Sequence, residues 1–139
     1  MSRQAIFADN APKAIGPYSH AIIAHGFVYC SGQTPIDPAT GDLVQGDIKA
    51  QAHQVMKNLQ TVLTAAGTDF EHVVKTNIFL NSMSDFAGVN EVYGSYFKGS
   101  YPARSTVGGL QLPKGALVEI EMVAMLPVPL TYEADEEQQ

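Results

Sequence analysis

The sequence predicts an α+β fold, in which one sheet of about six strands carries two helices on a single face. Two observations support this prediction. Segments with helical periodicity alternate with β-rich runs in the order β, ββ, α, β, α, ββ. Hydrophobic residues make up 45% of the 139 residues, which is enough for one compact core. We therefore expect a single domain over residues 1–130, followed by a flexible acidic tail over residues 131–139.

The N-terminal third is rich in β-forming and turn-forming residues. Residues 3–8 are typical of a short edge strand, and residues 10–20, which contain two prolines and a glycine, are typical of a loop. Residues 21–33 contain two β-rich runs on either side of His25-Gly26, which indicates a hairpin. Residues 34–46 are predicted as a turn-rich connection to the first helix.

The strongest periodic signal lies between Asp47 and Gly67. Apolar residues recur there at spacings of three and four and form one stripe of a helix: Ile48, Ala52, Val55, Met56, Leu59, Val62, Leu63 and Ala66. Asp47 is a good cap for the start of this helix, and Gly67 is a good cap for its end.

The remaining elements are a strand, a second helix and two strands. Residues 73–81 alternate in the manner of a strand, and residues 84–97 place their apolar side chains on one helical side, with Ser84 as a candidate cap. Residues 104–112 are predicted as a strand in which Gly108-Gly109 forms a bulge, and residues 117–125 as the last strand. The segment LPKGAL between them would allow the two strands to pair as a hairpin.

The charge and composition of the chain argue against several classes of partner. The chain has 8 basic and 14 acidic residues, a net charge of −6, and no basic stripe, so we expect no nucleic-acid partner. No apolar run reaches about 18 residues, and we expect no membrane span. The single cysteine and a start without a signal-peptide pattern favour a cytoplasmic protein. Strands that are apolar on both faces favour a homo-oligomer, in which a second copy covers the sheet.

Glu119 and Glu121 stand two residues apart on the last strand and therefore share one face of the sheet. Two interpretations remain open for them: a solvated strand face, or a carboxylate acting as general base beside a second, paired acid. Arg104 is the natural complement, because its planar fork binds a carboxylate with two hydrogen bonds. Chemistry alone gives equal weight to an internal salt bridge from Arg104 to Glu119 or Glu121 and to a substrate carboxylate.

The other polar candidates give weaker signals. Tyr18 stands on a Gly-Pro turn, where it would line a pocket or cover the edge of the core, and Ser31-Gly32 would allow a ligand to approach the backbone closely. His20 is predicted as a surface residue, and the remaining histidines lack metal-ligand spacing, so we expect no metal site. Cys30 is predicted as an inert core thiol, and no cofactor-binding motif is present.

Several stretches together resemble the YjgF family, whose enzymatic members are the RidA-type 2-iminobutanoate/2-iminopropanoate deaminases. They are AIGPYSHA, VYCSGQTPIDPATGDLV, VVKTNIFLNSMSDFAGVNEVYGSYF, YPARSTV and LPKGALVEIEMVAM. The resemblance implies a chorismate-mutase-like fold with a mixed sheet, and a homotrimer whose sheets form a central barrel with three pockets between subunits. It also implies hydrolysis of small 2-imino and enamine acids to 2-keto acids and ammonia, without a metal or cofactor. Relatives in mitochondria make that compartment the alternative to the cytoplasm.

Site residues follow from the resemblance by position. Arg104 matches the arginine that binds the substrate carboxylate, and Glu119 matches the glutamate that orients or deprotonates the attacking water. Where many deaminases carry a cysteine, this chain has Thr106, whose hydroxyl can still serve a water or an imine nitrogen. The substrate-binding positions implied by the resemblance are Tyr18, Ser31, Gly32, Asn90 and Arg104.

Two further departures from the family pattern bear on function. His20 stands where glutamine is common, and Gly108-Gly109 replaces a common Glu-Val pair, which affects the expected substrate range. The alternatives to the small-imino-acid deaminase are a non-catalytic member that binds metabolites, protects proteins or regulates translation, and a deaminase for larger imino acids. With the resemblance included, a substrate carboxylate becomes the favoured partner of Arg104.

Overall fold

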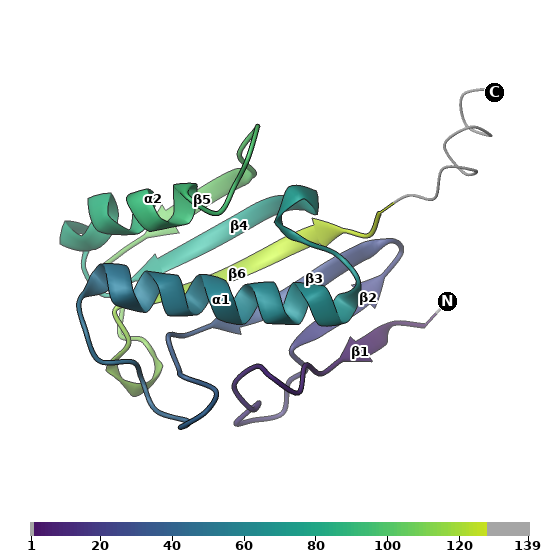
Figure 1. Cartoon of the computed structure of the whole chain (residues 1–139), viewed down its shortest axis with the longest axis horizontal. Helices are drawn as coiled ribbons and strands as arrows, with labels where there is room; N and C mark the ends of the chain where they lie inside the picture. The colour runs from purple at the N-terminus through teal and green to yellow at the C-terminus, as the bar shows by residue number, and fades with distance from the viewer. Residues whose placement is uncertain (1, 128–139) are drawn as a thin grey trace.

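The computed structural model describes residues 2–127 and confirms the α+β fold, with a six-stranded mixed sheet and two helices on one face (Figure 1). The strand order is β1-β2-β3-β6-β4-β5, in which β4 and β5 are parallel and the other neighbours antiparallel. The acidic segment 131–139 lies outside the described residues. The elements are β1 (Gln4–Ile6), β2 (Ala21–Ala24), β3 (Phe27–Gln33), α1 (Ile48–Ala66), β4 (Val73–Leu80), α2 (Phe86–Gly94), β5 (Ala103–Val107) and β6 (Val118–Met125).

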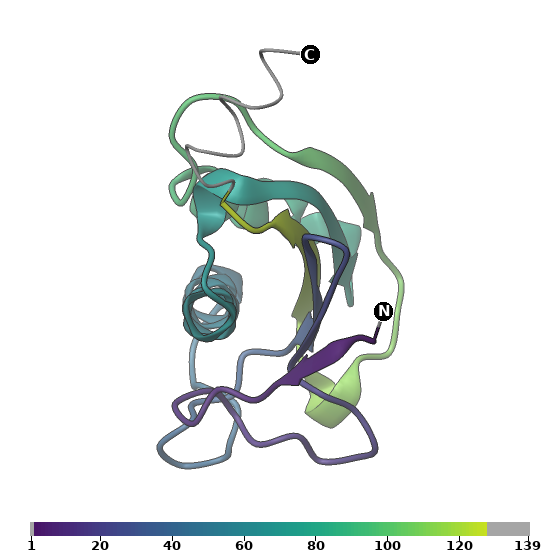
Figure 2. The ribbon, with the colours of Figure 1, turned by 90° about the vertical axis from the view of Figure 1, so that its right-hand side faces the viewer.

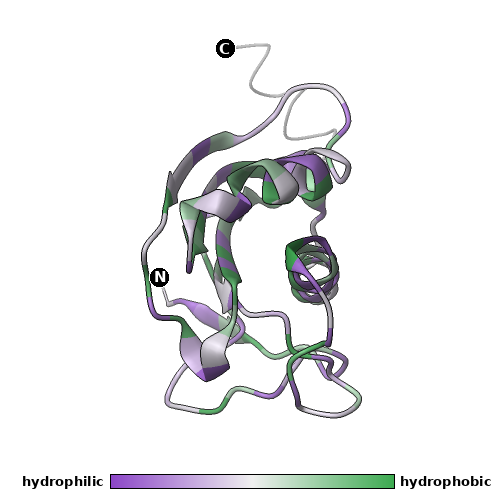
Figure 3. Ribbon diagram, turned by 90° about the vertical axis from the view of Figure 1, so that its left-hand side faces the viewer, coloured by the Kyte–Doolittle hydropathy of each residue, from purple (hydrophilic) through white to green (hydrophobic). Residues whose placement is uncertain are grey.

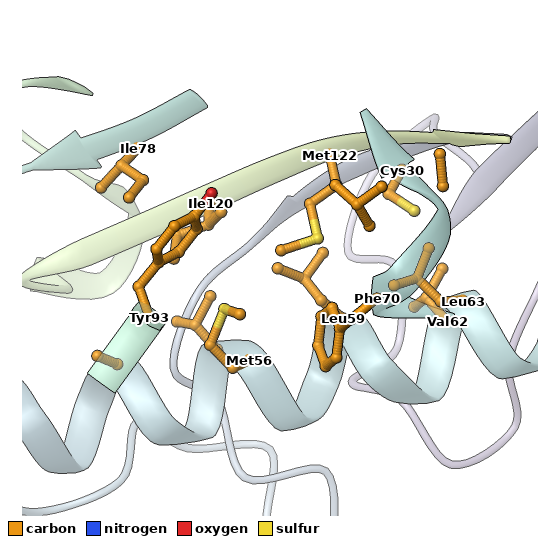
Figure 4. Packing of buried hydrophobic residues seen from close by; sticks show 14 of the residues in the cluster. Cys30, Met56, Leu59, Val62, Leu63, Phe70, Ile78, Tyr93, Ile120 and Met122 are labelled. Atoms are coloured by element: carbon orange, nitrogen blue, oxygen red, sulfur yellow. The ribbon is translucent and has the colours of Figure 1, made fainter. Parts of the chain in front are cut away.

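Helix α1 forms as its periodicity predicts, with both predicted caps. The Asp47 Oδ1 accepts a hydrogen bond from the Ala50 N–H at 3.0 Å. Gly67 has a φ of 89°, and its N–H donates to the carbonyls of Leu63 and Thr64. The apolar stripe of α1 packs on the sheet, where Figure 4 shows Met56 and Leu59 near side chains of β6. None of the helices in the described part of the chain is long and apolar enough to cross a membrane.

The sheet has a closed face, which the helices cover, and an open face on the other side. Figure 2 shows the sheet curving around α1 on the closed face. Strand β6 alternates between the two faces as its sequence predicts: Val118, Ile120, Met122 and Ala124 are buried on the closed face. Glu119, Glu121, Val123 and Met125 therefore stand on the open face, which none of the described elements covers.

The open face exposes several large apolar side chains beside its acids, and Figure 3 shows hydrophobic and hydrophilic residues alternating along the strands. Phe27, Tyr29, Val107 and Met125 are 37%, 48%, 49% and 40% exposed, respectively. Phe27 pairs with Met125 across β3 and β6, so these side chains are neighbours on one surface. An apolar surface of this kind, rimmed by polar residues, is typical of an interaction site.

The hairpin between the last two strands is absent, because β4 lies between β5 and β6. β5 pairs parallel to β4, and α2 provides the crossover that a parallel pair requires. The register places Arg104 opposite Thr76, and Thr76 opposite Met122. Paired residues share a face, so Arg104 stands on the closed face of the sheet.

β5 also ends earlier than predicted, and the expected bulge at Gly108-Gly109 is wrong. A Cβ at Gly108 would lie 2.5 Å from the Met83 Cγ, and Gly109 has a φ of 75°. The two glycines therefore let the chain leave the sheet past Met83 after Val107, rather than insert a residue into a continuing strand.

Helix α2 is shorter than the predicted range 84–97. Residues Met83–Asp85 form a 3₁₀ turn, and the N-cap of α2 is Asp85, which makes no side-chain capping bond. Beyond Gly94 the chain leaves the helix, and Tyr96 and Phe97 pack at 5.6 Å against the ring of Phe70. Tertiary packing of aromatic side chains thus produces the apolar pattern that extends past the end of the helix.

Replacement of Asp47 by alanine should lower the free energy of unfolding by about 1 kcal/mol, because the Ala50 N–H loses its acceptor at the start of α1. Chemical denaturation at one fixed protein concentration measures this change. Asp47→Ser retains an acceptor and should recover most of the loss. Equal stability of Asp47→Ala and the unmodified protein would contradict the role of this cap.

Candidate functional site

A β-bulge in β3 brings the backbone of this strand close to the carboxylate of Glu119. Between Cys30 and Gln33 two residues of β3 oppose one residue of β6, so Ser31 and Gly32 form the bulge. The Glu119 carboxylate lies over Gly32, where an added Cβ would be 2.5 Å from its Oε2. A larger residue at position 32 would displace the Glu119 carboxylate, so Gly32 allows the close approach of this side chain.

A cleft of about 270 Å³ opens beside this bulge, and we call it the Glu119 cleft. It combines one carboxylate with apolar and basic walls from the loop 10–20 and the turn before β6. The site residues that the sequence predicted here are together: the cleft is lined by Tyr18, Ser31, Gly32 and Glu119, with Lys13 and Lys114 among the other lining residues.

The Tyr18 loop, residues 8–20, is fastened to the bulge by hydrogen bonds. The Ser31 hydroxyl donates to the Ser19 carbonyl at 2.7 Å, and the Ser31 N–H donates to the His20 carbonyl at 3.0 Å. The Tyr18 hydroxyl accepts from the Ile15 N–H at 3.4 Å, and the Tyr18 side chain is 42% exposed. Ser31 therefore positions the Tyr18 loop, and the backbone of Ser31 lies beside the Glu119 cleft. The prediction that His20 lies on the surface is wrong, because it is 3% exposed.

Glu119 is partly buried and lies near a second acid. Burial raises the pKa of the Glu119 carboxyl, and the negative charge of Glu121 raises that pKa further. Glu121 is held by a hydrogen bond at 3.0 Å from the Asn77 amide. A carboxylate with a raised pKa is a stronger proton acceptor than an ordinary one, which suits Glu119 to general-base chemistry.

Arg104 lies under α2 in a different environment. Its Nη1 donates to the Asn90 Oδ1 at 2.7 Å. The central carbon of its guanidinium lies 5.5 Å from the ring centroid of Phe86 and 5.3 Å from that of Tyr93. A cleft of about 290 Å³, the Arg104 cleft, is lined by Asn90, Tyr93, Gly94, Tyr101, Pro102 and Arg104.

The internal salt bridge from Arg104 to Glu119 or Glu121 is absent. Glu119 pairs with Phe79, which puts it on the open face, whereas Arg104 stands on the closed face opposite Thr76. Among the residues that the structure describes, no acidic side chain pairs with Arg104. Its guanidinium has five N–H donors, and the bond to Asn90 uses one of them. The remaining donors have no acidic partner among the described residues, and Arg104 lines a cleft, so these donors can bind an external carboxylate.

Thr106 stands two residues after Arg104 on the same face of β5. Its Oγ1 is buried and has no hydrogen-bond partner among the described residues. Buried hydroxyl groups are normally paired, so the orphaned Thr106 Oγ1 is a candidate contact for a polar ligand atom.

The aromatic partners of Arg104 were not predicted from the sequence. Phe86, Asn90 and Tyr93 have spacings of four and three along α2, so they share the helix face toward Arg104. This spacing was visible in the sequence, but an apolar stripe of this kind is normally read as core. Only the parallel pairing of β5 shows that the stripe also contacts a guanidinium.

Other reactive side chains in the described residues do not add a second reaction centre. Burial raises the pKa of the Cys30 thiol to about 12, which keeps it protonated and unreactive. No three His, Cys, Asp or Glu side chains within residues 2–127 are arranged to hold a metal ion.

The fold and the two clefts define a small α+β protein with a ring-stacked arginine on one sheet face and a partly buried glutamate on the other. A family model described as endoribonuclease L-PSP matches residues 8–126. The chain belongs to this family, which is the YjgF/RidA family that its motifs resemble.

Individual relatives cover nearly the whole chain. Protein DfrA of Myxococcus xanthus is 56% identical over 127 residues, which are 90% of this chain and 97% of DfrA. The 2-iminobutanoate/2-iminopropanoate deaminase of Mus musculus is 48% identical over 123 residues, 88% of this chain and 91% of that enzyme. The crystal structure of YyfA, a Rid-family protein from Yersinia pestis, has a TM-score of 0.87 and 52% identity, and the match covers 90% of this chain and all (100%) of YyfA.

The Glu119 carboxyl should titrate above the ordinary range of glutamate, because burial and Glu121 both disfavour its charge. Carbon-detected NMR of the carboxyl group, assigned by its loss in Glu119→Gln, measures the midpoint. Glu121→Gln should lower this midpoint and leave it above the ordinary value, since burial is the larger cause. A midpoint at or below that of an exposed glutamate would contradict this description of the cleft.

Proposed function

We propose that the protein is a hydrolytic deaminase that converts small 2-imino acids, such as 2-iminobutanoate and 2-iminopropanoate, to 2-keto acids and ammonia. The observation that carries the proposal is that the chain holds both groups the reaction needs: an arginine fork without an acidic partner, and a glutamate with a raised pKa. Relatives that are named as deaminases of this kind support the same assignment. We expect the reaction to take place in the cytoplasm, with mitochondria as the alternative.

Arg104 binds the substrate carboxylate in this proposal. Phe86 and Tyr93 restrict the position of the guanidinium and exclude water from its faces, while Asn90 fixes one of its N–H groups. A planar fork held in this way is already oriented for two parallel hydrogen bonds to a carboxylate. The binding energy then comes with little loss of side-chain freedom.

Glu119 takes a proton from one water, and the resulting hydroxide equivalent attacks the imine carbon. The C–O bond forms as the C=N π electrons move to nitrogen, which gives a tetrahedral carbinolamine. Glu119 returns its proton to nitrogen, and the hydroxyl proton also passes to nitrogen as the C=O bond forms and the C–N bond breaks. This releases ammonia and leaves the 2-keto acid. An enamine substrate first takes a proton on carbon and becomes the imine. The buried Thr106 hydroxyl is suited to hold the water or the imine nitrogen.

In this proposal a second copy of the chain joins the two half-sites. Arg104 and Glu119 stand on opposite faces of one sheet, so we expect a substrate to contact Arg104 of one chain and Glu119 of another. A neighbouring subunit that packs on the open face would cover Phe27, Tyr29, Val107 and Met125 and complete the site. We propose the homotrimer of the family resemblance, with each active site between two subunits.

A non-catalytic role is the main alternative, because the family includes proteins with other names and descriptions. The family description names an endoribonuclease, whereas the net charge of −6 gives this chain little attraction for RNA. Release of ammonia from freshly generated imino acids, compared with cleavage of a single-stranded RNA, separates the two activities, and the absence of both would favour the non-catalytic role. A panel of larger imino acids tests the substrate range.

Arg104→Ala should remove about 2–5 kcal/mol of transition-state stabilisation for 2-iminopropanoate, because the carboxylate loses a desolvated charged partner. This corresponds to a fall in kcat/KM of about 30-fold to about 5,000-fold. Coupled detection of ammonia measures the rate. Arg104→Lys keeps the charge without the fork and should give an intermediate value. Arg3→Ala removes the chain's other arginine, which is exposed, and should leave the rate unchanged. Full activity in Arg104→Ala would remove the clamp from the mechanism, whereas no activity in the unmodified protein would refute the proposed function.

Two inactive variants should complement each other if each site is shared between subunits. Arg104→Ala and Glu119→Gln, unfolded and refolded together in equal amounts, should recover about a quarter of the unmodified activity in trimers, because some interfaces then carry one intact copy of each residue. Native mass spectrometry confirms that mixed oligomers form. Mixed oligomers that remain inactive would show that Arg104 and Glu119 act from the same chain.

A further inference from the structure

His20 is a buried histidine with two backbone partners in the Tyr18 loop. The side chain is 3% exposed and lies 5.6 Å from the Phe7 ring. Its Nδ1 contacts the Ala8 nitrogen at 2.9 Å, and its Nε2 contacts the Pro12 carbonyl oxygen at 2.8 Å. One ring thus bridges the start of the loop and a point four residues further along it.

The two partners determine which proton the ring carries. The Ala8 N–H can only donate, so Nδ1 must accept and carries no proton. The Pro12 carbonyl can only accept, so Nε2 must donate. The bridge therefore requires the neutral ring with its proton on Nε2. A doubly protonated ring would place two donors face to face at Ala8.

The same residue is joined to the Glu119 cleft through its backbone. The His20 carbonyl accepts from the Ser31 N–H at 3.0 Å, and the neighbouring Ser19 carbonyl accepts from the Ser31 hydroxyl at 2.7 Å. Tyr18 lies two residues before His20, on the wall of the cleft. The ring of His20 therefore connects Ala8 and Pro12, at the start of the loop, to the residues that hold Tyr18 against the bulge.

We propose that His20 is a positioning residue of the Glu119 cleft: its neutral ring holds the Tyr18 loop in place, and protonation of the ring releases the loop. The inference rests on the proposed function in so far as Tyr18 and Ser31 belong to the active site. It adds an acid-sensitive element that is separate from Arg104 and Glu119.

The described residues near the ring include few titratable side chains. On the loop itself the titratable neighbours in sequence are Asp9 and Lys13, and both are exposed. The titratable residues of β3 are Tyr29 and Cys30, and the Cys30 thiol stays neutral because burial raises its pKa to about 12. Across from residues 7–10, α1 presents Gln60, Thr61 and Thr64, which do not titrate. The hydrogen bonds of the ring are with Ala8 and Pro12, and neither partner is a carboxylate.

Glutamine is the uncharged side chain that can replace both bonds. Its amide has an acceptor oxygen and a donor nitrogen, which match Ala8 and Pro12, and it does not titrate. Leucine has a similar size but would leave the buried Ala8 N–H and the partly buried Pro12 carbonyl without partners, which carries a cost for each. Leucine therefore tests the loss of the hydrogen bonds at similar packing. Glutamine keeps the hydrogen bonds and tests the loss of protonation.

The first test is a pH profile of kcat/KM for 2-iminopropanoate between about pH 8 and about pH 5, the interval in which histidines change charge. At pH 8, His20→Gln should match the unmodified protein, and His20→Leu should fall about fivefold or more. At pH 5, His20→Gln should exceed the unmodified protein by a similar factor. His25→Asn, in the exposed turn between β2 and β3, is the control and should keep the unmodified profile. Parallel profiles of His20→Gln and the unmodified protein would overturn the proposal.

The second test does not depend on activity. Hydrogen exchange at the Ala8 amide should be slow at pH 8 in the unmodified protein and in His20→Gln, after correction for intrinsic exchange. At pH 5 the amide should lose protection in the unmodified protein alone. Nitrogen NMR of the His20 ring should show the proton on Nε2 at pH 8. A proton on Nδ1, or equal protection of Ala8 in both proteins at pH 5, would refute the bridge. Loss of deaminase activity in all variants, with these spectra as expected, would instead refute the proposed function.

Discussion

The alternation of side chains across the sheet controls on which face Arg104, Thr106 and Glu119 lie. On β6, buried apolar residues face the helices, so the intervening Glu119 and Glu121 must face the other way. On β5 the parallel register with β4 gives the opposite result for Arg104, which faces the helices together with Thr76. A shift of β6 by one residue would bury its two glutamates in the core, and a shift of β5 would turn Arg104 to the open face. The core and the two clefts are therefore fixed by the same register.

This arrangement links assembly to chemistry. The open face carries both the exposed apolar side chains and the Glu119 cleft, so a subunit that covers the former also approaches the latter. In the proposed trimer the same contact between subunits stabilises the interface and completes the active site. Such a design also keeps the arginine and the glutamate apart in a single chain, where a direct salt bridge would neutralise both.

The Glu119 cleft carries a stability cost that is consistent with a functional role. A partly buried carboxyl beside a second acid has a raised pKa, so the folded protein binds its proton more tightly than the unfolded chain does. The stability that this proton contributes is present at low pH and is lost as the pH rises through the folded-state pKa. At neutral pH the folded state holds a charge that its surroundings disfavour. Gly32 adds a second constraint, because any larger residue would displace the carboxylate.

Local pattern determined much of this protein from sequence alone. The stripe and caps of α1, the β2–β3 hairpin at His25-Gly26 and the alternation of β6 depend on residues close in sequence, and each was predicted correctly. The sequence motifs also indicated the family. The pairing of β5 with β4, the bridge made by His20 and the rings around Arg104 join residues that are distant in sequence or hidden in loops. Only the tertiary structure decided these, because backbone register and burial, rather than residue type, select which polar groups meet.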